Sequence, residues 1–274
     1  MRRVVFNQKG GVGKSSIASN LAAISAHKGL KTLLIDLDSQ CNSTQYLLGK
    51  NAGRIQNDVG VFFSQLLSFK LRPQKLQSFI HRTPFPNLDI IPSSPVLGEI
   101  QGQLEAKHKI YKLRDALASL DRYDAVYIDT PPAYNFYTMS ALISAHSCLI
   151  PFDCDEFSRQ ALYSLMDNVE EMCQDHNSKL KIEGIVVNQF QPRASLPVRV
   201  VNELKEEGLP ILNSYISSSV KMRESHDQCL PLIQSAPKHK LTSEFLALFD
   251  ELHPQMSSAV TNLRSKKSAD KESV

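Results

Sequence analysis

Short, almost uninterrupted apolar runs recur along the chain and are separated by stretches with helical spacing. The first run, 4–6, leads through a glycine-rich segment to Ile17, Leu21 and Ile24, whose spacing predicts a helix that stops at Gly29. Further strand-length runs cover 32–37, 88–91, 125–128, 149–152 and 185–187. Uniformly apolar runs are typical of strands buried on both faces. The alternation predicts an α/β, doubly wound fold, with a mostly parallel sheet and helices on both faces.

Length and composition predict one folded domain with a short tail. A chain of 274 residues that is 42% apolar can bury a sizeable core, and we expect that domain to cover residues 1–253. The tail, 254–274, is rich in Ser, Lys and Asp and nearly without apolar residues after Leu263, so we expect it to be disordered. Apolar runs are too short to cross a bilayer, and a strand at the N-terminus leaves no room for a signal peptide. These features predict a cytoplasmic protein.

The segment after the first apolar run has the composition of a phosphate-binding loop. It consists of Lys9, Gly10, Gly11, Val12, Gly13, Lys14, Ser15 and Ser16. Glycines allow backbone N–H groups to surround phosphate oxygens, while Lys14 suits the terminal phosphates and Ser15 suits a magnesium ion. The following helix would point its N-terminus at the anion. Lys9 is not needed for such a cradle, so it has either a role in solvent or a role on phosphates that its own loop does not reach.

Carboxylates stand at the ends of two predicted strands. Asp36 and Asp38 stand at the C-terminal end of the run 32–37, and Asp129 follows the run 125–128. Open α/β sheets bind ligands at the carboxyl ends of their strands, where paired acids need a cation or a water. We therefore predict that Asp36 and Asp129 surround a magnesium ion together with Ser15. Each aspartate could alternatively cap the helix that follows it.

These motifs together resemble the ParA/MinD family of P-loop ATPases, in particular its ParA (Soj-like) branch. Residues 9–15 are similar to the deviant Walker A motif, 36–44 to a second acidic motif, and 129–132 to Walker B. Strings at 88–94, 149–152 and 185–188 are also similar to strings of the ParA branch. The resemblance covers roughly residues 2–252 and implies a P-loop NTPase fold that uses ATP and Mg²⁺.

The resemblance also implies a role for each matching residue. Lys14 would hold the β and γ phosphates, Ser15 would ligate Mg²⁺, and Asp129 would hold the ion through water. Asp38 would position and activate the attacking water. Lys9 would be the family's signature lysine, which crosses into the nucleotide site of the partner in an ATP-bound homodimer.

Asn188 ends an apolar run and is the best candidate to read adenine, because an amide can pair with a ring nitrogen and with the exocyclic amine. The alternative is a turn residue that follows a strand.

By resemblance, the ATP-bound dimer would bind nucleoid DNA without sequence preference. A ParB-like or cargo-adaptor activator would accelerate its slow ATP hydrolysis, and the cargo would be a chromosome, a plasmid or a protein assembly. The net charge of +3 is weak evidence for DNA binding. The candidate contacts are Arg199 and Lys205 in a helix over 198–207, and Lys221 and Arg223 after a presumed strand over 211–216. The alternative is that these are solvated faces balanced by neighbouring glutamates.

One loop departs from the family pattern, and two other functions are alternatives to this interpretation. Where ParA proteins usually read Ile-Pro-Arg-Asn-Val-Arg, residues 216–221 read Ile-Ser-Ser-Ser-Val-Lys, which predicts an altered loop at Ser217–Ser219 and a weaker or relocated DNA surface. A MinD-like membrane-cycling ATPase would need an amphipathic C-terminal helix, for which Met256, Val260 and Leu263 are too few, so no stable membrane insertion is expected. A biosynthetic ATP-dependent enzyme would need a substrate pocket beside the loop.

Overall fold

The computed structural model describes residues 1–69, 71–154 and 158–255. All but the first two residues of the tail that we predict to be disordered lie outside these ranges. Among the described residues, no helix combines the length and the apolar character needed to cross a bilayer.

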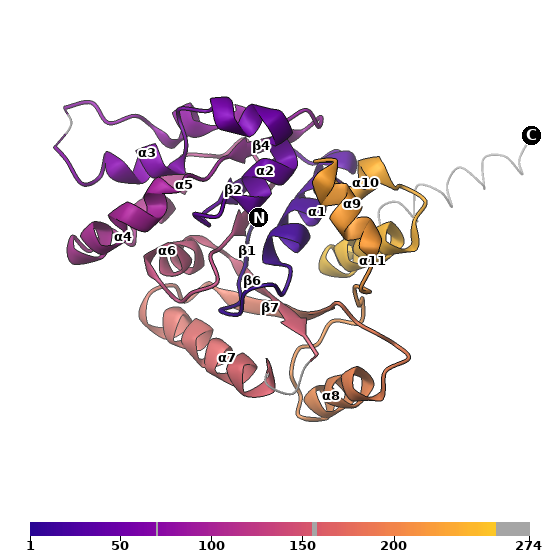
Figure 1. Cartoon of the computed structure of the whole chain (residues 1–274). Coiled ribbons are helices and arrows are strands. Elements are labelled where there is room, and N and C mark those ends of the chain that lie inside the picture. The colour runs from indigo at the N-terminus through magenta and orange to yellow at the C-terminus, as the bar shows by residue number, and fades with distance from the viewer. Residues whose placement is uncertain (70, 155–157, 256–274) are drawn as a thin grey trace, which may run out of the picture.

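One sheet forms the centre of the described chain (Figure 1). Its strands are β1 (Arg2–Val5), β2 (Thr32–Asp36), β3 (His81–Arg82), β4 (Leu88–Ile91), β5 (Ala125–Asp129), β6 (Ser147–Asp153) and β7 (Lys181–Asn188). Their spatial order is β3-β4-β2-β5-β1-β6-β7, and only β3 runs antiparallel to its neighbour. The predicted mostly parallel sheet is thereby confirmed.

Helices occupy the connections between the strands and the chain after β7. They are α1 (Lys14–His27), α2 (Asn42–Leu48), α3 (Val59–Ser64), α4 (Val96–Ala106), α5 (Lys112–Leu117), α6 (Phe136–Ser144), α7 (Ser158–Asp175), α8 (Ser195–Glu206), α9 (Val220–Asp227), α10 (Leu232–Ser235) and α11 (Lys240–Leu252). Short 3₁₀ turns occupy Gly49–Arg54 and Leu76–Phe79. Helix α1 ends just before Gly29, whose φ of +94° lies in the left-handed region that favours glycine, as its sequence predicts.

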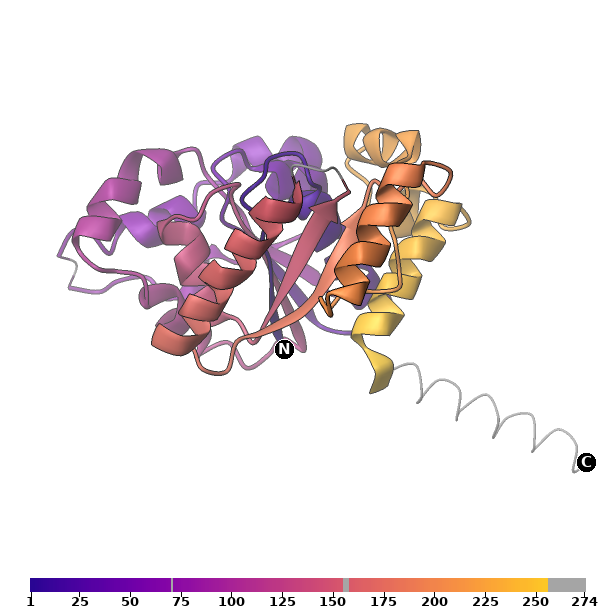
Figure 2. The same ribbon diagram turned by 90° about the horizontal axis from the view of Figure 1, so that it is seen from below.

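Two apolar cores lie on the two faces of the sheet, because successive side chains of a strand point to opposite faces. On one face Val4, Ile35 and Ile128 pack in a core with residues of α3 to α8. On the other face Val5 and Leu34 pack with α1, α10 and α11. Figure 2 shows helices on both sides of the strands. This burial on both faces explains the uniformly apolar strand sequences and confirms the doubly wound fold.

The prediction of a strand over 211–216 is wrong. The segment forms no continuous strand: Ile211 makes an isolated bridge to Ile185 of β7, the amide of Ile216 donates to the carbonyl of Val187, and Ser217 pairs with Phe190 just beyond β7. Between the bridges, the backbone amides of Asn213 and Ser214 donate to the carboxylate of Glu251 on α11, each at 2.8 Å. The middle of the segment therefore bonds to α11 instead of extending the sheet.

The parallel register brings the polar strand ends together. Asp129 at the end of β5 lies opposite Asp36 of β2 and Val5 of β1. The loop between β1 and α1 begins directly after Val5, so the glycine-rich segment and both carboxylates meet at one edge of the sheet.

Candidate functional site

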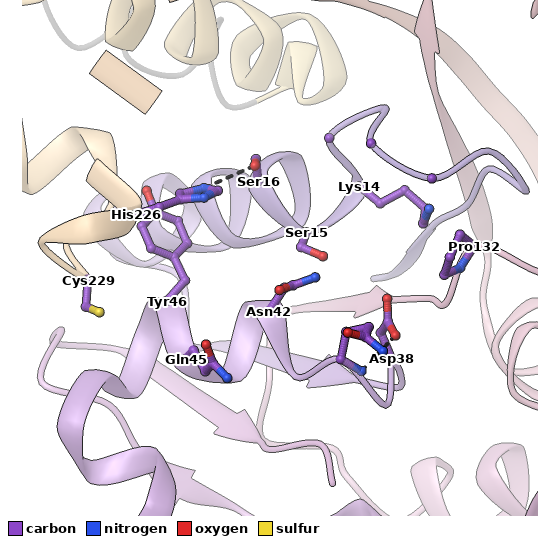
Figure 3. A pocket seen from close by; sticks show the side chains of 14 residues that line it. Lys14, Ser15, Ser16, Asp38, Asn42, Gln45, Tyr46, Pro132, His226 and Cys229 are labelled. Atoms are coloured by element: carbon purple, nitrogen blue, oxygen red, sulfur yellow. Dashed lines mark hydrogen bonds between the residues drawn. The ribbon is translucent and has the colours of Figure 1, made fainter. Parts of the chain in front are cut away.

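A cavity of 540 Å³ opens at this edge, between the glycine-rich loop, α2 and the end of α9 (Figure 3). The residues that line it are Gly10, Gly11, Gly13, Lys14, Ser15, Ser16, Asp38, Gln40, Asn42, Gln45, Tyr46, Pro132, His226 and Cys229. The loop, the start of α1 and the catalytic candidate Asp38 therefore share one space, as the sequence predicts.

The backbone of the loop requires its glycines. Gly11 and Gly13 have φ of +78° and +88°, a region that side chains rarely adopt. A Cβ at Gly13 would come within 2.3 Å of Nδ2 of Asn188. The Nζ atom of Lys14 donates to the carbonyl of Lys9 at 3.1 Å and lies among the lining groups. Burial lowers the pKa of Lys14, while the carboxylates of Asp129 and Asp38 act to raise it. Backbone donors, a helix N-terminus and a lysine at one point suit a phosphate group.

Asp129 is fully buried, and its two carboxylate oxygens have different surroundings. Its Oδ2 accepts a hydrogen bond from the hydroxyl of Ser43 at 2.7 Å. Its Oδ1 has no hydrogen-bond partner among the described residues. Burial raises the pKa of Asp129 to about 6, although the hydroxyls of Ser15 and Ser43 and the charge of Lys14 act to lower it. A buried carboxylate oxygen of this kind near a serine hydroxyl fits a hydrated magnesium ion, whose water would donate to it.

Asp36 and Asp38 occupy different environments. Asp36 does not line the cavity: it accepts bonds from the amide of Asp38 at 3.1 Å and from the amide and hydroxyl of Thr44 at 2.8 and 2.7 Å. Burial, followed by the charge of Asp129, raises the pKa of Asp36 to about 8. Asp38 accepts from the amide of Gln40 at 3.0 Å and lines the cavity. This arrangement favours a positioning role for Asp36 rather than the metal-ligand role expected from the sequence.

Three side chains that matter in this geometry were not singled out by the sequence. Ser43 and Thr44 hold the two buried aspartates, and their only signal was membership of the second acidic motif. His226 reaches the loop from α9, where its Nε2 lies 3.1 Å from the hydroxyl of Ser16. A histidine far along the chain, in no motif, gave no sign of this contact.

Asn188 and Lys9 flank the loop. The Nδ2 atom of Asn188 donates to the carbonyl of Val12 at 2.9 Å. Asn188 lines a second cavity of 220 Å³ next to the first, together with loop glycines, Ser16, the segment from Ile216 to Val220, Met222 and Arg223. Lys9 is half-buried, its amide donates to Oδ1 of Asn7 at 2.8 Å, and it is not among the residues that line the 540 Å³ cavity.

The four basic candidates lie on two separate helices. Arg199 and Lys205 are on α8 and Lys221 and Arg223 are on α9, and these helices lie apart in Figure 1. Lys205 donates to Oδ1 of Asn213 at 3.1 Å, whereas Arg199 and Lys221 pair with glutamates one turn along their own helices. Arg223 is exposed and lines the 220 Å³ cavity. The four side chains therefore do not form one continuous patch.

Comparisons with known proteins agree with this geometry. The AAA domain family model matches residues 3–182. The chromosome partitioning protein ParA of Myxococcus xanthus is 32% identical over 252 residues, which cover 90% of this chain and 86% of that protein. A cobyrinic acid a,c-diamide synthase of Mycobacterium smegmatis, solved with an ATP analogue and magnesium, has a TM-score of 0.72 and 25% identity, covering 85% of this chain and 96% of that one. The cell division ATPase MinD of Pyrococcus furiosus has a TM-score of 0.72 at 22% identity, covering 93% and 99%.

Proposed function

Because the chain belongs to the ParA/MinD family of P-loop partitioning ATPases, we propose that it is a switch in which ATP and Mg²⁺ assemble a homodimer. The dimer holds DNA without sequence preference, and hydrolysis releases it. The observation that carries the proposal is the shared cavity: the loop, Ser15 and Asp38 face one space, and Asp129 lies beside it with an oxygen that has no partner among the described residues. The function that follows is to segregate or position a chromosome, a plasmid or a protein assembly, on the nucleoid within the cytoplasm.

Each residue of the site has a role in this proposal. The loop amides and Lys14 bind the phosphates, and Ser15 with Asp129 holds the magnesium ion, Asp129 through water. When bound, the ion neutralises charge that develops on the phosphates during transfer. Asp36 fixes the amide of Asp38 and the start of α2. Asn188 borders the 220 Å³ cavity, where an adenine ring would be read.

Asp38 is the proposed group that positions the attacking water. The residue lines the cavity and is held by two hydrogen bonds. The carboxylate of Asp38 accepts from the backbone amide of Gln40, and the backbone amide of Asp38 donates to the carboxylate of Asp36. A single carboxylate without a second base gives slow intrinsic hydrolysis, which a ParB-like or cargo-adaptor partner would accelerate. We expect Asp38→Ala to bind ATP and to lose phosphate release by at least tenfold. The exposed Asp167→Ala serves as a matched control, and undiminished phosphate release by Asp38→Ala would overturn this role.

The proposed output is DNA binding through backbone contacts. Basic residues on α8 and α9 without interleaved aromatic side chains favour phosphate contacts over base stacking. Co-sedimentation of the ATP-bound protein with random-sequence DNA and, separately, with anionic liposomes tests this output. Binding to DNA that weakens steeply with salt supports it. Binding to liposomes but not to DNA would instead support a membrane-cycling ATPase of the MinD kind.

A biosynthetic enzyme is the second candidate, because the 540 Å³ cavity extends beyond the loop to Gln45, Tyr46 and Cys229. A small carboxylate substrate could lie there beside the phosphates, with Lys14 near both. The similarity to a cobyrinic acid a,c-diamide synthase is the comparison that favours this candidate. ATP turnover that rises with a metabolite, and that needs neither DNA nor a protein partner, would support it over the switch.

A further inference from the structure

Helix α9 contributes side chains to both cavities at the nucleotide site. His226 lines the 540 Å³ cavity, and Val220, Met222 and Arg223 line the 220 Å³ cavity. Ser16, the last residue of the loop, lines both. A nucleotide that fills either space therefore meets α9.

Helix α9 is shallowly packed, and its side-chain contacts lead back to the nucleotide-binding elements. Only Ser225 of this helix is buried, and its hydroxyl bonds to that of Tyr46 on α2. The ring of His226 packs on Tyr46 with centroids 4.4 Å apart. The amide of Asn20 on α1 lies 3.8 Å from Sδ of Met222 and also donates to the Tyr46 hydroxyl at 3.2 Å. The position of α9 thus depends on α1 and α2.

The direct link to the phosphate loop is the hydrogen bond between His226 Nε2 and the hydroxyl of Ser16, drawn as a dashed line in Figure 3. Without a nucleotide either group can donate, because a hydroxyl has one proton and two lone pairs and a neutral imidazole has two tautomers. A phosphate oxygen accepts only. If the Ser16 hydroxyl donates its one proton to a phosphate oxygen, it can only accept from His226. Nε2 of His226 must then carry the proton and donate it to Ser16.

We propose that His226 is a positioning residue that couples nucleotide binding to the placement of α9, through a directed chain from His226 Nε2–H to the Ser16 hydroxyl to a phosphate oxygen. The proposal rests on the proposed function only in requiring that ATP bind at this loop. It does not depend on DNA binding. Because α9 also carries Lys221 and Arg223, the same coupling would move those two cations.

The chain contains no tryptophan, which allows a single reporter on α9. Asp227→Trp places it at the exposed last residue of the helix, next to His226 and outside both cavities. The emission of this reporter is measured with and without a saturating non-hydrolysable ATP analogue and Mg²⁺. Equilibrium dialysis of the labelled analogue measures binding independently.

We expect the analogue to shift the emission of the reporter protein. His226→Ala in the reporter background should weaken binding about fivefold, the loss of one ordinary hydrogen bond, and should remove most of the emission shift at saturation. His226→Gln, which can still donate to Ser16, should restore both. His27→Ala, an exposed histidine at the end of α1, is the control and should behave like the parent.

Two results would overturn the proposal. An equal emission shift in the His226→Ala and parent reporters, or no shift in a parent reporter that binds the analogue, contradicts the coupling and leaves the proposed function standing. Absence of analogue binding in the parent protein by dialysis contradicts the proposed function and the coupling with it.

Discussion

At the scale of single residues, the site is defined by a buried charge that is suited to a cation. Asp129 has one oxygen on Ser43 and one without a partner among the described residues. Asp36 lies opposite it in the neighbouring strand and carries three hydrogen bonds of its own. Two carboxylates this close repel each other when both are ionised, so the metal-free site costs free energy that a bound ion would offset.

These two groups add to the stability a contribution that falls as the pH rises, whereas His146, His226 and His253, whose pKa values burial lowers, add one that rises. Burial raises the pKa of Asp129 from 3.8 to about 6 and the pKa of Asp36 to about 8. A carboxyl whose pKa is raised by folding contributes stability that is full below its unfolded pKa and is lost as the pH rises through its folded pKa. We predict that the unfolding free energy of the metal-free protein, measured by urea titration relative to that of the double variant Asp36→Asn, Asp129→Asn, falls between about pH 4 and 8. A rise of this difference over that window would contradict the assigned directions.

Asp129→Asn should show separately how much this buried charge lowers the unfolding free energy and whether it binds the magnesium ion. At pH 8 the substitution should stabilise the metal-free protein by about 1 to 3 kcal/mol, because it removes a desolvated charge. It should also abolish the Mg²⁺ dependence of ATP binding, measured by calorimetry. Asp167→Ala, on the exposed face of α7, should change neither quantity. Retained Mg²⁺ dependence in Asp129→Asn would remove Asp129 from the ion site.

Gly13 provides a second residue-scale prediction. Gly13→Ala would place a methyl group within 2.3 Å of Asn188 at a φ of +88°. We expect nucleotide affinity to fall at least tenfold, because the loop must shift to relieve the contact. Gly98→Ala in α4 is a matched control, since a Cβ there meets nothing within 4 Å. Equal affinity in the two variants would show that the loop geometry is not required.

At the scale of elements, α2 joins the acidic strand end to the cavity. Thr44 donates to Asp36 and accepts from the amide of Ser93, so it connects α2 to β2 and to the segment after β4. Thr44→Val keeps the shape, removes the partner of the Ser93 amide and takes away one of the three hydrogen bonds of Asp36. We predict a loss of about 2 kcal/mol in unfolding free energy by urea denaturation. Thr44→Ser, which retains the hydroxyl, should lose less; equal losses would assign the effect to packing.

Local sequence predicts some elements here and not others. The strands β2 and β5 are buried on both faces, so their apolar runs were sufficient to find them, and the glycines of the loop indicated the turn into α1. The segment 211–216 looks like a strand by composition, yet its amides at 213 and 214 bond to Glu251 on α11. A partner 37 residues away in sequence decides this conformation, and no local pattern contains it.

The same limit applies to the two neighbouring acids. Asp36 and Asp38 are two residues apart, so strand alternation would place them on one side. Strand β2 ends at Asp36, and the chain then turns, which sends Asp36 toward Thr44 and Asp38 into the cavity. The spacing of the motif predicts that both acids are near the phosphates. It does not predict which acid bonds to Thr44 and which one lines the cavity.

Across the molecule as a unit, the proposed DNA surface is divided between α8 and α9. Binding of a dimer would then sum contacts from two helices of each chain rather than from one patch. We predict that Lys205→Glu and Arg223→Glu each weaken DNA binding and each reduce the slope of log affinity against log salt by about one for every phosphate that is no longer neutralised. Lys50→Glu, exposed on the 3₁₀ turn after α2, is the control. An unchanged slope in both test variants would place the DNA surface elsewhere.

The proposed switch depends above all on Lys9, which converts nucleotide binding in one chain into contact with a second. Lys9 stands at the entry of the loop but does not line the 540 Å³ cavity of its own chain, whereas Lys14 does. Sedimentation velocity of Lys9→Ala and of the control Lys50→Ala, each with a non-hydrolysable ATP analogue and Mg²⁺, tests this role directly. We predict dimers for Lys50→Ala and monomers for Lys9→Ala, with analogue affinity within about threefold of the parent because the cradle is intact. Normal dimers of Lys9→Ala would contradict the role.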